Sequence, residues 1–222
     1  MALNINGTTG ISGVDGSVSA PAVTGTDSNT GITFPSADTI KFSTGGVERI
    51  SITNSGISGT GISAGGITQA DIYRLTTTIN ATYNSVDIIA SNWERPDESD
   101  DVFDKIGSGM SESSGIFTFP ATGIYFVSFI ARWYGNGNTS GANHIYMDAT
   151  VNNSSYVTVA QSAAYTGNSY QTTVIAQTMI DITDVSNRKM RFKHYAGGGN
   201  QQVLGNSTKN ETFVTFIRLG DT

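Results

Sequence analysis

The stretch that most constrains this chain is Ile116–Arg132, which contains two apolar segments of strand length joined by a tight turn. Pro120 fixes its own φ and Gly123 permits a positive φ, so the intervening Pro-Ala-Thr-Gly is typical of a turn. The second segment, Ile124–Ala131, is apolar at both odd and even positions. A strand with two apolar faces requires cover on both sides. We expect a domain core on one side and a further body, such as another subunit, on the other.

The chain downstream of residue 67 has the pattern of a β protein. Ile, Val, Thr, Phe and Tyr dominate its apolar residues, and these recur at alternate positions in short segments separated by turn-rich sequence. Many short strands at this spacing, with no convincing helix, predict an antiparallel two-sheet sandwich or jelly roll. The expected strands cover 72–79, 86–90, 116–119, 124–133, 145–151, 156–160, 172–182, 189–195 and 212–219.

Residues 1–67 differ sharply in composition, because they hold 13 of the 26 Gly but only the aromatic residues Phe34 and Phe42. Such a segment cannot bury enough apolar surface to offset its ordering entropy alone. Gly-Ile-Ser or Gly-Ile-Thr recurs at positions 10, 31, 56, 61 and 66, and the alternation at 40–42 and 50–52 predicts a small hairpin. We expect an extended or fibrous β arm at 1–67, ordered by other chains, before a head domain at 68–222. A flexible linker is the alternative.

Charge and composition exclude several classes of function. The net charge is -6 and no basic patch stands out in the sequence, which argues against nucleic acid and anionic membranes as partners. The absence of Cys excludes disulfides, thiolate metal sites and a cysteine nucleophile. No run of about 18 apolar residues predicts a membrane-inserted helix. The first ten residues lack the basic and apolar regions of a signal peptide.

The candidate chemical groups favour structural roles. The acidic run Glu94–Asp104 could bind Ca²⁺ through clustered oxygen ligands, but it lacks a D-x-D-x-D-G loop and is better interpreted as a solvated loop. His144 and His194 have no partner at metal-ligand spacing, and His194 is in phase with Met190 and Phe192, as a core or interface histidine would be. No G-x-S-x-G elbow lies between a strand and a helix. We predict no cofactor, no metal and no catalytic residue.

Three turn segments, Tyr134–Asn143, Tyr165–Gln171 and Tyr195–Gln202, combine Tyr with Asn, Gly, Ser and Gln. Rigid amphipathic rings beside adaptable polar groups are typical of recognition loops for protein or sugar. Ordinary turns favour the same small residues, so both interpretations stay open. The candidate receptor contacts are Tyr134, Asn136, Asn138, Asn143, Tyr165, Asn168, Tyr170 and Asn200.

The segment Ser113–Phe129, SSGIFTFPATGIYFVSF, resembles the G-x-F-x-x-P-x-x-G-x-Y-x-F motif of the trimeric jelly-roll family of complement component one-q heads and tumour necrosis factor. Val127 stands where that family usually has an aromatic residue. Thr212–Leu219 is similar to the closing strand of the family, although Val214 and Thr215 stand where Gly is common. The motif residues that match are Gly115, Phe117, Pro120, Gly123 and Tyr125.

This resemblance and the strand with two apolar faces predict a homotrimer. We place four side chains at its three-fold interface, although slipping the register by one residue would exchange the two faces of the strand. These candidates are Tyr125, Val127, Phe129 and Phe216.

The segments MALNINGTTGISG, DTIKFSTGGVERISI and SNWERPD resemble short tail-fibre or virion-surface proteins of marine tailed phages, particularly cyanophages. The resemblance implies a non-enzymatic virion surface protein, made in the host cytoplasm. Residues 1–67 would bind other virion proteins, and the head would contact a host cell-surface glycan or protein. A capsid decoration protein without a receptor is the main alternative. A bacterial lectin-like or polysaccharide-degrading domain is a third.

Overall fold

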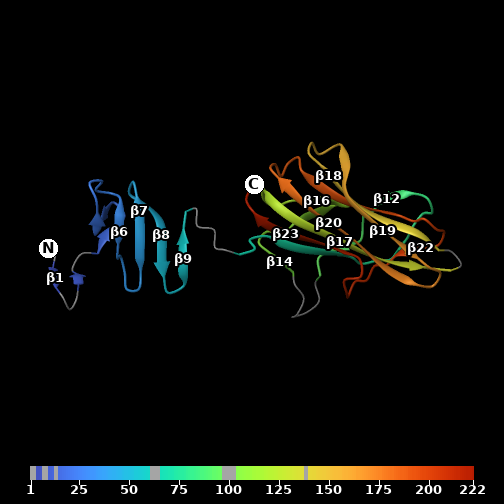
Figure 1. Ribbon diagram of the computed structural model, residues 1–222, viewed down its shortest axis with the longest axis horizontal. Coiled ribbons are helices and arrows are strands. Elements are labelled where there is room, and N and C mark those ends of the chain that lie inside the picture. The colour runs from blue at the N-terminus through green and yellow to red at the C-terminus, as the bar shows by residue number, and fades with distance from the viewer. Residues whose placement is uncertain (1–3, 7–9, 13–14, 61–65, 97–103, 138–139) are drawn as a thin grey trace. The chain divides into compact units, whose positions relative to one another are not determined.

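The computed structural model describes the 222-residue chain apart from residues 1–3, 7–9, 13–14, 61–65, 97–103 and 138–139 (Figure 1). Its described residues form strands, turns and loops, with no helix among them. Consequently, no described helix could cross a membrane. The chain divides into two compact units, 1–66 and 67–222, so the structural boundary lies one residue before the one expected from composition.

The N-terminal unit is built on a five-stranded antiparallel meander, in which each strand pairs with the next along the chain (Figure 1). The predicted hairpin forms its centre, and two of the Gly-Ile repeats form its strands β6 and β9. The meander strands are β5 (Val23–Thr24), β6 (Gly31–Thr33), β7 (Ile40–Thr44), β8 (Val47–Thr53) and β9 (Gly56–Gly59). Two further pairs precede it: β1 (Asn4–Asn6) with β2 (Gly10–Ser12), and β3 (Gly16–Ser17) with β4 (Ala20–Pro21).

One face of this meander is apolar and partly exposed. Cross-strand partners share a face, and so do residues two apart on one strand. The register aligns Ile32 with Phe42 and Ile50, and Ile40 with Ile52 and Ile57. We call these six residues the isoleucine face. Three of them, Ile40, Phe42 and Ile57, are 36–58% exposed, whereas the buried side chains of the unit are the small polar Thr33, Ser43 and Ser51.

The head consists of two antiparallel sheets packed face to face, with neighbours drawn from distant parts of the chain in the manner of a jelly roll (Figure 1). The first head sheet contains β10 (Ala70–Leu75), β11 (Ile79–Asn80), β13 (Trp93–Glu94), β14 (Lys105–Ile106), β17 (Gly123–Gly135), β20 (Gln171–Ile182), β22 (Gln201–Val203) and β23 (Phe213–Gly220). The second contains β12 (Val86–Ile88), β15 (Ser111–Ser113), β16 (Ile116–Thr118), β18 (Gly141–Thr150), β19 (Tyr156–Thr166) and β21 (Lys189–Tyr195).

The sequence motif at 115–127 lies at the centre of the head core. Phe117 of β16 packs edge-on against Tyr73 and Trp93, with ring centroids 5.2 and 5.5 Å away. The preceding Gly115 has a φ of +78°, and a Cβ there would lie 2.4 Å from the carbonyl oxygen of Ile89. Only glycine therefore fits this turn without strain. The motif is explained by core packing and by a close backbone approach.

The structure corrects the assignment of faces on β17. Tyr125, Val127, Phe129 and Phe216 are 0–1% exposed, inside the sandwich of a single chain. The prediction that they meet a neighbouring subunit is therefore wrong. The alternate residues of β17, including Phe126 and Ile130, point outward instead. The sequence could not decide between the faces because both are apolar, and a shift of one residue exchanges them.

Candidate recognition surface

The three predicted recognition loops meet at one end of the head and are tied together through their backbones. The backbone N–H of Gly135 donates to the Tyr170 carbonyl oxygen at 3.0 Å, and that of Asn136 donates to the Asn200 carbonyl oxygen at 2.9 Å. Ser169 N–H donates in turn to the Gly135 oxygen at 2.7 Å. These bonds fix the loops relative to one another, as a preformed contact surface requires.

Most of the predicted contact residues are accessible at this surface. Tyr165 and Tyr170 are 67% and 72% exposed, and the Tyr165 hydroxyl lies 2.6 Å from the Ser140 hydroxyl. Tyr134 is half-buried, and Asn138 lies outside the described residues. The exposed asparagines of the surface are Asn136, Asn168 and Asn200.

Asn143 is misassigned by the sequence, because the structure buries it completely. Its side-chain amide donates to Gln201 Oε1 at 2.9 Å, and its Oδ1 accepts the Gly197 N–H at 3.2 Å. A buried amide bonded in this way holds the base of the 195–202 loop in place. Asn143 is thus a support of the surface and does not reach a partner.

Tyr83 belongs to the same end of the head and was not among the predicted contacts. Its backbone forms a parallel bridge with Ala196, and its side chain is 64% exposed. The segment Asn80–Ser85 combines Tyr with Asn, Thr and Ser, the same composition that marked the other loops. The composition of this segment could therefore have identified Tyr83 from the sequence.

The histidines and carboxylates of the described part of the head do not gather into a metal site. His194 is a core histidine, as its phase predicted, with its ring centroid 6.0 Å from that of Trp133. Burial lowers its pKa, because the charged form loses water. No group of three His, Asp or Glu side chains among the described residues could hold a metal ion. Residues 97–103 of the predicted acidic loop lie outside the described residues, whereas its first member, Glu94, lies in β13 and pairs with Arg74 at 2.6 Å.

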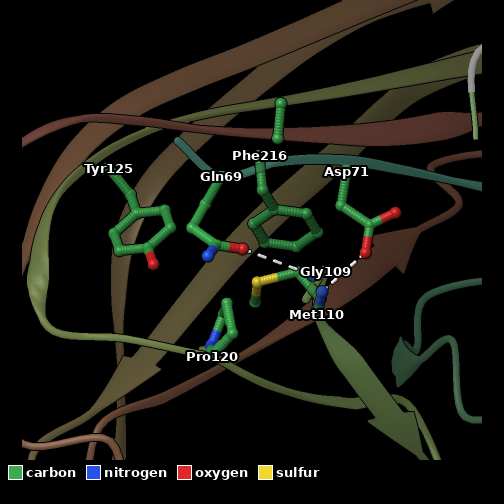
Figure 2. A pocket seen from close by; sticks show the side chains of 8 residues that line it. Gln69, Asp71, Gly109, Met110, Pro120, Tyr125 and Phe216 are labelled. Atoms are coloured by element: carbon green, nitrogen blue, oxygen red, sulfur yellow. Dashed lines mark hydrogen bonds between the residues drawn. The ribbon is translucent and has the colours of Figure 1, made fainter. Parts of the chain in front are cut away.

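A narrow pocket lies between Asp71, Met110 and Tyr125 (Figure 2). Its walls leave no room for a water molecule. The Asp71 carboxylate accepts from Met110 N–H at 2.6 Å and from both Arg95 Nε and a terminal Arg95 nitrogen at 2.8 Å. With these partners the carboxylate anchors the 105–110 segment.

Comparisons with known proteins give only distant similarities. No protein-family model and no curated protein matches the chain. Murine APRIL at pH 8.0 is similar with 13% identity and a TM-score of 0.46, over 68% of this chain and 98% of that one. Eiger TNF from S. frugiperda is 12% identical, with a TM-score of 0.49, over 69% and 93%. The globular domain of zebrafish complement 1qA is 14% identical, with a TM-score of 0.40, over 67% and 93%. The jelly-roll assignment rests on the strand order itself.

Proposed function

We propose that this chain is a non-enzymatic, homotrimeric virion surface protein, with an N-terminal unit that anchors it to the particle and a head that contacts the host surface. One observation carries the oligomeric part: each of the two units has an apolar sheet face that the described residues of that unit leave partly uncovered. Contiguous exposed apolar surface of this kind marks a protein–protein interface.

In the head, the uncovered face is the outer side of the first head sheet. Phe126 of β17 pairs with Met179 of β20, and Ile130 pairs with Ile175, so their side chains lie together on that side. Met179 is 69% exposed. We call this set the outer apolar row. Its members are Ile124, Phe126, Ile130, Ile175, Met179, Phe213 and Ile217.

The isoleucine face of the N-terminal unit requires cover even more strongly than the outer apolar row does. A single sheet with an open apolar side is at best marginal in water, since nothing removes those side chains from solvent. Other copies of the same chain supply matching faces. The number three follows from the resemblance of the motif at 115–127 to a family of trimeric heads.

The virion role rests on the resemblance of the N-terminal sequence to tail-fibre and virion-surface proteins of tailed phages. The division of the chain into two units is consistent with one unit that anchors the protein and another that contacts the host. Several weak sites on each trimer, repeated over a particle, would give high avidity without any tight single site. The recognition loops, with exposed Tyr83, Tyr165 and Tyr170, are the proposed contact surface.

The oligomer is tested by the native mass of the full chain and of two variants. Met179→Glu in the head and Ile57→Glu in the N-terminal unit each place a charge on a face that assembly buries, so each weakens the trimer and the double variant is monomeric. Val157→Glu is the matched control, since Val157 is 64% exposed on the other head sheet. A double variant that stays trimeric, or a wild type that is monomeric, refutes the proposed assembly.

The host contact is tested separately on intact trimers. A Tyr165→Ser/Tyr170→Ser variant removes two exposed rings without touching the core, so it loses binding to host cells while keeping its mass. Immunolabelling of intact particles locates the protein. If the antibody labels the particles but purified trimers bind no host cells, the capsid decoration role is favoured over receptor contact.

A further inference from the structure

The outer side of the second head sheet carries a row of cations that the proposed recognition loops do not include. Lys189, Arg191 and Lys193 alternate along β21, so all three side chains leave the sheet on the same side. Successive members are about 7 Å apart along the strand, as two residues of a β-strand span. A protein with a net charge of -6 has concentrated positive charge at this place.

One buried carboxylate holds two of these cations in position. Asp148 of β18 is 1% exposed and accepts from Arg191 Nε at 3.1 Å, from Lys193 Nζ at 2.9 Å and from the Thr158 hydroxyl at 2.8 Å. Although burial alone would raise the pKa of Asp148, these hydrogen bonds lower it overall. The carboxylate therefore stays ionised and fixes both cations.

Two aromatic rings on the neighbouring strands also contact these cations. The Arg191 guanidinium carbon lies 4.1 Å from the ring centroid of Tyr156, and Lys193 Nζ lies 5.3 Å from that of Tyr146. Such cation–π contacts restrict long, flexible side chains. We call Lys189, Arg191, Lys193, Asp148, Tyr146 and Tyr156 the cation ladder.

The ladder has an unbalanced charge. Lys189 forms no ion pair with the described residues, and Asp148 is the only acidic side chain on this side of the second head sheet's strands. Three cations against one carboxylate leave two positive charges on a fixed surface. The neighbours on the same side are mixed: Thr118, Gln161 and Ser113 can form hydrogen bonds, whereas Ile116 opposite Arg191 and Ile88 opposite Lys193 are apolar. This surface suits an anionic ligand rich in hydroxyl groups.

We propose that the cation ladder binds an acidic polysaccharide whose anionic groups are spaced apart along the chain. This assignment rests on the proposed function, since it names the class of host-surface ligand that the head would meet. A sparsely charged polysaccharide places its carboxylates on the ladder and its hydroxyl groups on the Thr, Ser and Gln side chains. A densely charged polymer such as nucleic acid would be repelled by the net negative charge of the rest of the molecule.

The test measures binding of full-length trimers to hyaluronan, with neutral dextran and a single-stranded oligonucleotide as comparison polymers. We expect salt-sensitive binding to hyaluronan and none to dextran. Lys189→Gln/Lys193→Gln should weaken binding about tenfold, because two partly exposed charge contacts are lost. Arg191 remains to neutralise Asp148 in that variant.

The matched control is Lys105→Gln/Lys209→Gln, which removes two exposed cations elsewhere in the head and should leave binding unchanged. Equal loss in both double variants would mean that only net charge matters, and would overturn the site. Tighter binding of the oligonucleotide, or equal binding of dextran, would also overturn it. Trimers that bind none of the polymers refute the ladder alone, whereas a monomeric wild type refutes the proposed assembly independently of this result.

Discussion

The two units of this chain bury different kinds of side chain. The head encloses a continuous core between two sheets, with Phe117, Trp133 and Phe192 at 0% exposure. The N-terminal unit is built on a single meander, buries Thr33 and Ser43, and leaves its isoleucine face in contact with solvent. Both units are regular β structure, so hydrogen-bonded strands alone do not make a folding unit. What differs is whether a second layer removes the apolar side from water.

This contrast indicates that the units draw stability from different sources. The head can be stabilised by its own side chains, whereas the N-terminal unit depends on neighbouring copies. The stability of the N-terminal unit should therefore depend on protein concentration, and that of the head core much less so. The four experiments below challenge that distinction.

The largest effect is expected for Phe117→Ala in the head. Four aromatic rings have centroids 5.2–5.5 Å from that of Phe117, so truncation leaves a cavity at the centre of the core. We expect the free energy of unfolding to fall by about 3–5 kcal/mol, measured by denaturant titration. Phe42→Ala, at a half-open position, should cost the dilute, monomeric chain about 1 kcal/mol or less. Equal costs would show that the N-terminal unit has a core of its own.

The next effect concerns the buried ion pair that closes one side of the head. Arg95→Met leaves the Asp71 carboxylate buried beside Met110 without its counter-charge. Because Arg95 is itself partly exposed, we expect a loss of about 3 kcal/mol, at the low end for a buried pair. The double variant Asp71→Asn/Arg95→Met removes the stranded charge and should recover part of that loss. If it is no more stable than Arg95→Met, the burial of charge is not the cause.

The third effect is a pH dependence confined to the head, which contains both histidines of the chain. Burial lowers the pKa of His194 in the folded state, while nearby Asp87 opposes the shift. As the pH falls below about 6.5, the unfolded chain takes up a proton before the folded one does, so stability is lost. The melting temperature of the head should drop between about pH 7 and about pH 5, and His194→Gln should flatten that drop. An unchanged slope in the variant would assign the dependence to other groups.

The sequence predicted the sandwich, its central strands and the position of the boundary between the units because these depend on local patterns. Alternation marked the strands, and the loss of aromatic residues before position 68 marked the change of unit. The inward face of β17 could not be predicted, because Tyr125 and Phe126 place an aromatic ring on each face of the strand. Only the sheet that packs opposite decides which of them is buried.

The candidate surfaces show a similar limit. The recognition loops were found through composition, yet composition could not separate exposed Asn136 from Asn143, which is buried in β18, since both are asparagines of one turn-rich segment. The cation ladder left only a partial local signal, the alternating Lys189, Arg191 and Lys193 of one segment. Asp148, Tyr156 and Arg191 lie on three strands, and only the pairing of β18 with β19 and β21 brings them together. A site assembled across several strands cannot be identified from the sequence of any one segment.

The smallest effect is expected for the ion pair between Lys41 and Glu48, on the polar side of the N-terminal meander. Their charged atoms are 2.6 Å apart, with side chains 29% and 37% exposed. Glu48→Gln should change the stability of the assembled protein by about 0.5 kcal/mol or less, because water screens an exposed pair. A double-mutant cycle with Lys41→Met isolates the pair from other effects. If the isoleucine face is the one that assembly covers, Lys41 and Glu48 stay in solvent and the coupling stays small. A coupling well above about 1 kcal/mol would mean that assembly buries the polar side instead, and would reverse the proposed packing of the N-terminal unit.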